Sequence, residues 1–137
     1  MSRPCSLVAA KEIGAVDLLI LTVDDSPTMQ GLIADALEYA GFETIAASNG
    51  VEGLKVLQGE SNIDLIISDV NMMVMGGFEF VSKVREIPSF AYTPILFLTT
   101  EASQNFKDIG REVGATGWLT KPFNPDGLVK TVRRLLP

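Results

Sequence analysis

Short apolar runs alternate along this chain with longer segments in which apolar residues recur every three or four positions. Apolar runs of this length, bounded by polar residues, favour strands buried on both faces, whereas the longer spacing indicates helices. Apolar runs of this kind lie at residues 18–23, 65–67 and 94–98, and two shorter segments with more polar residues, 43–47 and 115–119, complete the five predicted strands. A predicted helix follows each of them.

The segment after the first predicted strand gives the clearest helix. Ser26 can cap its amino end and Pro27 suits its first position. Gly41 can supply the left-handed residue that ends it. The stripe that we expect to be buried has spacings of three and four residues and consists of Met29, Leu32, Ile33, Ala36, Leu37 and Ala40.

Interior glycines mark two other predicted helices. Asn49 can open the second helix, with Gly59 as a left-handed stop. Gly53 lies inside that helix and Gly110 inside the fourth, and an interior glycine weakens a helix. Both helices are therefore expected to be weak, and the fourth is expected to be the least stable.

The regular alternation of strands and helices defines the fold class. It predicts an α/β protein whose parallel sheet is covered on both faces by right-handed crossovers. A length of 137 residues suits one domain. We expect a tail over residues 1–16 and the domain over residues 17–137.

The amino-acid composition indicates the cellular compartment and argues against one class of binding partner. A hydrophobic content of 47% is sufficient for a core, and the lone Cys5 fits a reducing compartment. We see neither a signal peptide nor a segment of membrane-spanning length, so we expect a cytoplasmic protein without membrane insertion. The net charge of −6, without a run of Lys or Arg, argues against direct nucleic-acid binding.

Polar side chains stand at the carboxyl ends of four predicted strands. They are Asp24, Asp25, Asp69, Thr99 and Lys121. Because parallel strands end along one edge, these residues are expected to converge. Carboxylate oxygens suit Mg²⁺, and a lysine would balance the charge. The alternative is a set of solvated turn acids with a surface lysine.

The motifs that contain these residues resemble those of a known family. They are V-D-D at 23–25, S-D-V-N-M at 68–72, L-T-T-E at 98–101 and K-P-F at 121–123. In order and spacing they are similar to the receiver domain of two-component response regulators, in its CheY-like form, over residues 17–136. The resemblance implies a flavodoxin-like, doubly wound (βα)5 fold with five parallel strands in the order 2-1-3-4-5.

The resemblance also implies a phosphorylation switch. Asp69 would accept a phosphoryl group from the phosphohistidine of a sensor histidine kinase or phosphotransfer protein. Asp25 and Asp69 would bind Mg²⁺ directly, Asp24 through water and Asn71 through its backbone carbonyl. Lys121 would neutralise charge. Such a domain is not a dedicated enzyme, although it would catalyse its own phosphorylation and dephosphorylation.

Further roles follow from the same resemblance. Thr99 matches the family's switch hydroxyl and Trp118 its switch aromatic, and Asn71 and Glu101 border the path of the hydrolytic water. The Lys121–Pro122 peptide would be cis. Phosphorylation would change a face made by the fourth helix, fifth strand and fifth helix, which would bind a downstream protein or a phosphatase.

Some residues depart from the family pattern. Met73 replaces a usual proline, and Thr100 is bulkier than the usual neighbour of the switch hydroxyl, which would slow both gain and loss of phosphate. The methionines at 72, 73 and 75 suit either an adaptable contact surface or gap filling.

Three other functions remain open from the sequence. The chain could be a receiver excised from a larger regulator. It could also be a Mg²⁺-dependent phosphohydrolase of the haloacid dehalogenase type, although Asn71 stands where that family has a second Asp. Topology alone would allow a flavin-binding electron carrier, although the acid cluster would repel the flavin phosphate.

Overall fold

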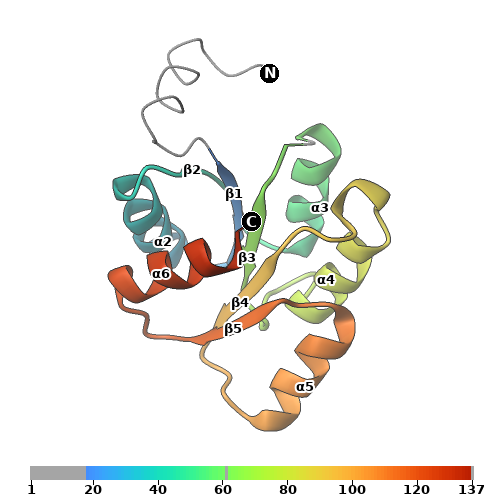
Figure 1. Ribbon diagram of the computed structural model, residues 1–137. Coiled ribbons are helices and arrows are strands. Elements are labelled where there is room, and N and C mark those ends of the chain that lie inside the picture. The colour runs from blue at the N-terminus through green and yellow to red at the C-terminus, as the bar shows by residue number, and fades with distance from the viewer. Residues whose placement is uncertain (1–17, 61, 137) are drawn as a thin grey trace.

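A computed structural model describes residues 18–60 and 62–136, so the expected tail lies outside the described residues. Five strands form one parallel sheet in the order β2-β1-β3-β4-β5, which confirms the predicted fold (Figure 1). The strands are β1 (Leu19–Val23), β2 (Glu43–Ala47), β3 (Leu65–Ser68), β4 (Ile95–Thr99) and β5 (Gly117–Thr120). The helices are α2 (Pro27–Tyr39), α3 (Gly50–Gly59), α4 (Gly77–Arg85), the 3₁₀ turn η1 (Pro88–Phe90), α5 (Gln104–Val113) and α6 (Pro125–Leu135).

Helices cover both faces of the sheet, with α2 and α6 on one side and α3, α4 and α5 on the other (Figure 1). Successive side chains of a strand point to opposite faces, so the central strands β1, β3 and β4 contribute to two cores. Ile20 packs with the α2 and α6 side, whereas Leu21 packs with the α3 and α4 side. Burial on both faces explains why β1, β3 and β4 are apolar runs rather than alternating ones, whereas the edge strands β2 and β5 are only partly buried.

Strand register brings the carboxyl ends together. Val23 of β1 is paired with Ser68 of β3, and the Asp69 amide donates to the Val23 carbonyl at 2.9 Å. Between the ends of β4 and β5, the Lys121 amide donates to the Thr99 carbonyl at 2.7 Å. The residues that follow β1, β3, β4 and β5 therefore share one edge.

Helix ends follow the predicted signals in most cases. The Ser26 hydroxyl accepts from the Met29 amide at 3.2 Å, and Gly41 is left-handed with φ 100°. The prediction for Gly59 was wrong. It is the last residue of α3, and the left-handed glycines in the described chain are Gly41 and Gly114. Helix α3 ends instead because the backbone becomes extended at the next residue, with φ −125°.

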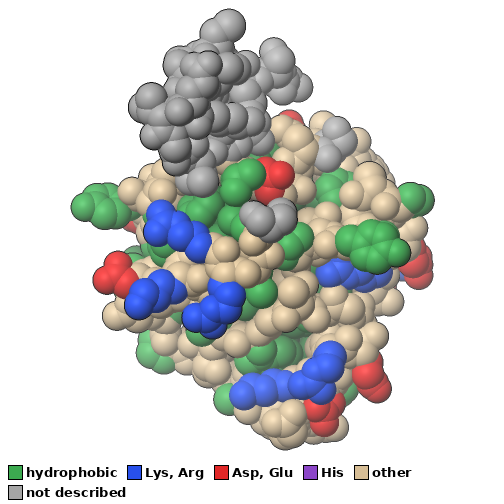
Figure 2. Space-filling model, in the orientation of Figure 1, with side chains coloured by type: hydrophobic (Ala, Val, Ile, Leu, Met, Phe, Trp, Pro, Cys, Tyr) green, Lys and Arg blue, Asp and Glu red, His purple; other side chains and the backbone are tan. Residues whose placement is uncertain are grey.

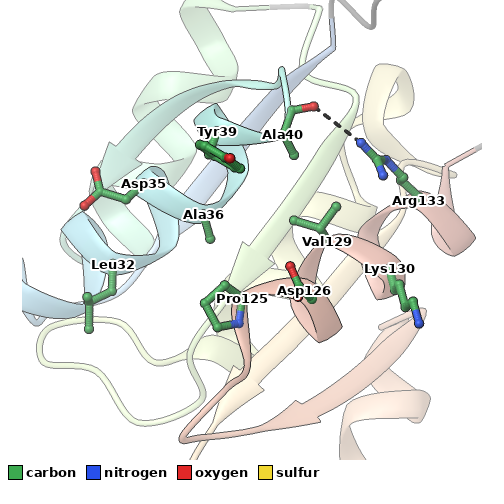
Figure 3. Close-up of a pocket in the computed structure, with 10 residues that line it drawn as sticks. All are labelled: Leu32, Asp35, Ala36, Tyr39, Ala40, Pro125, Asp126, Val129, Lys130 and Arg133. Carbon is green, nitrogen blue, oxygen red and sulfur yellow. Dashed lines mark hydrogen bonds between the residues drawn. The ribbon is translucent and has the colours of Figure 1, made fainter.

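The predicted stripe of α2 is only partly buried. Ile33 and Leu37 are buried, but Leu32 is 51% exposed. Leu32 lines a hollow of about 940 Å³ between α2 and α6 (Figure 3). Because α6 covers only part of this face, α2 presents an apolar side chain to the hollow instead of the core.

Two interior glycines allow close packing. A Cβ at Gly53 would lie 2.8 Å from the Phe80 ring, and one at Gly110 would lie 2.8 Å from the Trp118 ring. Distances this short exclude a side chain, so both glycines let a helix approach an aromatic residue. The loss of helix propensity is thus offset by contacts with the core.

The distribution of positive charge on the surface agrees with the absence of a run of Lys or Arg in the sequence. On the face in Figure 2, Lys and Arg side chains lie in separate small groups and form no continuous basic patch. Within residues 18–60 and 62–136, no helix has the length and apolar character needed to cross a membrane.

Candidate phosphoacceptor and metal site

Three carboxylates converge at the carboxyl edge of the sheet. Oxygens of Asp24, Asp25 and Asp69 lie within 4.8 Å of one another. Asp24 and Asp69 are 2% and 9% exposed, whereas Asp25 is exposed. The hollow between α2 and α6 is lined by other residues, so the acid cluster is a separate feature of the surface.

Lys121 bridges the two buried acids. Its Nζ donates to Asp24 Oδ2 at 2.7 Å and to Asp69 Oδ2 at 2.9 Å. Burial by itself lowers the pKa of Lys121, but hydrogen bonds and charge interactions with the two carboxylates outweigh burial, and the pKa is raised. The ammonium therefore remains charged at neutral pH, opposite the acids.

The second oxygen of each buried acid also has a partner. Asp24 Oδ1 accepts from the Ser26 amide at 2.9 Å, and Asp69 Oδ1 accepts from the Val70 amide at 2.7 Å. Each carboxylate thus accepts both a backbone amide and the Lys121 ammonium. These bonds offset the free energy that burial of a charge costs.

The donor set fits a hard divalent cation. Three carboxylates and one ammonium give −3 + 1, a net charge of −2. Oxygen ligands are those that Mg²⁺ prefers, and it usually retains waters beside one or two carboxylates. Exposed Asp25 offers a carboxylate on the solvent side, where a hydrated ion can enter.

Thr99 and the loop after it connect the site with β5. Thr99 is fully buried at the end of β4, and its Oγ1 accepts from the Glu101 amide at 3.4 Å. The Glu101 carboxylate accepts from Asn71 Nδ2 at 3.2 Å. The Glu101 carbonyl accepts from Trp118 Nε1 at 2.8 Å. Glu101 therefore contacts the end of β4, the loop after β3 and an indole on β5.

An aromatic cluster holds Trp118. Its ring lies 5.3 Å from Phe97 and 6.5 Å from Phe78, and Phe78 lies 5.8 Å from Phe106. Gly110 leaves room for the indole. Sequence reasoning identified Trp118 but missed Phe78 and the reason for Gly110. The pairing of a large aromatic with a glycine in the preceding helix was the available signal.

The loops beside the site differ in exposure. Thr100 is exposed, and Met73 and Val74 are 74% and 81% exposed. Met72 and Met75 instead pack partly against the core, as gap filling requires, whereas a contact role for Met73 stays a prediction. The Lys121–Pro122 peptide is cis.

Comparison with known proteins identifies the family. The model of the response regulator receiver domain matches residues 20–133. The chain belongs to the response regulator receiver family. It is a phosphorylation-dependent switch of two-component signalling, and this match does not favour a phosphohydrolase or a flavin carrier. The family is not one of dedicated enzymes.

Relatives support the family and the fold. The structure of the chemotaxis protein CheY4 of Vibrio cholerae matches with a TM-score of 0.85 and 49% identity, over 88% of this chain and 100% of that one. Chemotaxis protein CheY1 of Helicobacter pylori is 33% identical, over 85% of this chain and 95% of that protein. Some relatives are much longer. The chain matches 15% of the sensor histidine kinase CheAY of Helicobacter pylori, at 34% identity.

Proposed function

We propose that Asp69 is the phosphoacceptor, that Lys121 and Thr99 assist the transfer, and that the donor is a phosphohistidine of a sensor kinase or phosphotransfer protein. The observation that carries this proposal is the bridge from Lys121 to both Asp24 and Asp69. A buried cation between two acids, at an edge open to solvent through Asp25, is suited to receive a phosphoryl group.

The transfer is a displacement at phosphorus. A carboxylate oxygen of Asp69 forms the new O–P bond as the N–P bond of the phosphohistidine breaks, and the imidazole leaves. Positioning and charge neutralisation do most of the work in phosphoryl transfer. Lys121 places an ammonium 2.9 Å from Asp69, where it can meet a phosphoryl oxygen.

The proposed metal is Mg²⁺, held by Asp24, Asp25, Asp69 and the backbone carbonyl of Asn71. When bound, Mg²⁺ supplies positive charge against the phosphoryl oxygens. The net charge of −2 in the acid cluster and Lys121 gives the physical reason for a divalent ion. Without a counter-ion the cluster would repel an incoming phosphate.

The proposed switch runs through Thr99 and Trp118. A phosphoryl group on Asp69 offers an acceptor to the Thr99 hydroxyl, which now accepts from the Glu101 amide. If Thr99 moves toward phosphate, Glu101 moves with it, and Trp118 is bonded to the Glu101 carbonyl. The expected result is an altered face on α5, β5 and α6 that binds a target protein or a phosphatase.

The lifetime of the phosphorylated form is proposed to depend on Asn71 and Glu101. Their side chains are hydrogen-bonded to each other at the mouth of the site, where the hydrolytic water must approach. Exposed Thr100 stands beside Thr99 and would restrict the same approach. Chemotaxis in the cytoplasm is the proposed setting, because CheY4 and CheY1 are chemotaxis proteins.

Labelling by a small donor tests the proposal. The wild-type chain, Asp69→Asn and a control, Asp35→Asn on the exposed side of α2, are incubated with acetyl phosphate and Mg²⁺. Intact-mass measurement should show an acid-labile phosphate on wild type and on the control, and none on Asp69→Asn. Labelling of Asp69→Asn at the wild-type rate would assign the phosphate to another residue.

A further inference from the structure

The loop after Asp69 contains a turn that is unusual for its sequence. Val74 has φ 70°, and the Met75 amide donates to the Met73 carbonyl at 2.8 Å. A hydrogen bond from residue i+2 to residue i around a positive φ is a γ-turn of the rare, strained kind. A β-branched residue is among the least suited to this conformation. Glycine or asparagine at position 74 would make the same turn with less strain.

The surroundings hold this turn in place. Met75 packs on the start of α3, where a Cβ at Gly50 would lie 2.7 Å from the Met75 side chain. The Gly50 amide donates to the Met75 carbonyl at 3.2 Å, and the Gly77 amide donates to the Val70 carbonyl at 2.8 Å. Strained backbone persists where neighbouring structure fixes it in this way, often at functional sites.

The fold itself makes little use of the side chains at the tip of this turn. Met73 is 74% exposed and Val74 is 81% exposed. Strain at Val74 and exposure of two apolar side chains both oppose stability and solubility. Since glycine or asparagine would relieve the strain and polar residues would remove the exposure, these two residues are better explained by a contact with another molecule.

The position of the tip indicates which molecule. Other exposed large hydrophobic residues in the described chain include Tyr39 at the end of α2 and Tyr92 before β4, both at the opposite edge of the sheet. Met73 and Val74 lie in the loop that leaves Asp69. A protein that delivers a phosphoryl group to Asp69 must cover this edge, whereas a small phosphodonor reaches Asp69 without touching the tip.

We propose that Met73 and Val74 form an apolar contact for the protein that donates the phosphoryl group to Asp69. The donor presents an apolar patch beside its phosphohistidine, and the rigid turn holds both side chains ready for it. A preorganised contact loses little conformational entropy on binding. This inference rests on the proposed function, because it takes Asp69 as the phosphoacceptor.

Two donors of different size separate the contact from the chemistry. The first is acetyl phosphate. The second is the autophosphorylated histidine kinase, chosen from a panel, that labels the wild-type chain fastest. Met73→Ser/Val74→Asn keeps a residue that tolerates positive φ and removes both apolar side chains. Val74→Ile keeps the apolar surface and the same branching, and Tyr92→Ser removes an equally exposed apolar residue from the opposite edge.

The double variant should accept phosphate from the kinase at least tenfold more slowly than wild type, as expected when apolar anchors are removed from an interface. Its rate with acetyl phosphate should stay within about twofold of wild type, and both controls should match wild type with either donor. An unchanged rate from the kinase would overturn the proposal, as would an equal loss with both donors.

Two further outcomes distinguish this proposal from the proposed function. If acetyl phosphate fails to label Asp69 in wild type, the proposed function fails first. A wild-type chain that accepts phosphate from acetyl phosphate but from no kinase of the panel would overturn the contact together with the proposed phosphohistidine donor, and would leave Asp69 as the phosphoacceptor.

Discussion

Replacing Lys121 by methionine removes the cation between two buried acids and keeps most of the side-chain volume. The exposed fractions of the side chains are 10% for Lys121, 3% for Asp24 and 11% for Asp69. Water therefore screens the three charges only weakly. In the variant, two carboxylates face each other without the ammonium that they share.

The expected loss of stability follows from Coulomb's law. Two unit charges 4.8 Å apart, the limit found for the acid cluster, repel by about 3.5 kcal/mol at an effective dielectric constant of about 20. Removal of one partner from a buried ion pair costs about 3–5 kcal/mol. Because Asp25 opens the cluster to solvent, we expect Lys121→Met to lower the free energy of unfolding by about 3 kcal/mol.

Urea denaturation with and without millimolar Mg²⁺ measures this effect, with Trp118 fluorescence as the signal. Mg²⁺ should stabilise Lys121→Met more than wild type, because the ion no longer shares the carboxylates with an ammonium. Lys130→Met on α6, which is exposed, is the matched control and should change stability by less than about 0.5 kcal/mol. The reasoning is refuted if Lys121→Met is as stable as wild type, or if Mg²⁺ stabilises both proteins equally.

Three further changes, one of them paired with a control substitution, test other parts of the structure. Asp25→Ala should leave metal-free stability within about 0.5 kcal/mol of wild type, yet abolish the rise in melting temperature that Mg²⁺ causes; a retained rise would remove Asp25 from the metal site. Gly110→Ala should destabilise by about 1–2 kcal/mol, since overpacking against Trp118 exceeds the gain in helix propensity. Gly31→Ala, with open space around it, should stabilise by about 0.5–1 kcal/mol, and equal effects in urea denaturation would contradict this account. Trp118→Phe should lose about 1 kcal/mol with the hydrogen bond to Glu101, and unchanged stability would show that the bond is not formed in solution.

The sequence predicted most of the fold because its signals are local. Apolar runs identified the strands, and the caps at Ser26 and Asn49 were correct because they depend only on neighbouring residues. The predictions for Leu32 and Gly59 were wrong for different reasons. The exposure of Leu32 depends on how α6 lies beside α2. Helix α3 ends where the backbone becomes extended, and an extended residue does not need to be a glycine.

The sequence also indicated which residues belong at the site, since parallel strands must end along one edge. Only the tertiary structure decided how these residues interact. Lys121 is 97 residues from Asp24 and 52 residues from Asp69, and strand register with side-chain packing sets the distances between their charged atoms. No periodicity in the sequence encodes these distances.

The turn at Val74 and the hydrogen bond from Trp118 to Glu101 are likewise features that only the tertiary structure decided. By itself the sequence determined the order of strands and helices, and with it the edge on which the chemistry lies. The packed structure decided the backbone angle of Val74, the place of the indole beside Gly110 and the pairing of each carboxylate. These depend on contacts between segments that are distant in the chain, and such contacts form only when the sheet and its helices are assembled.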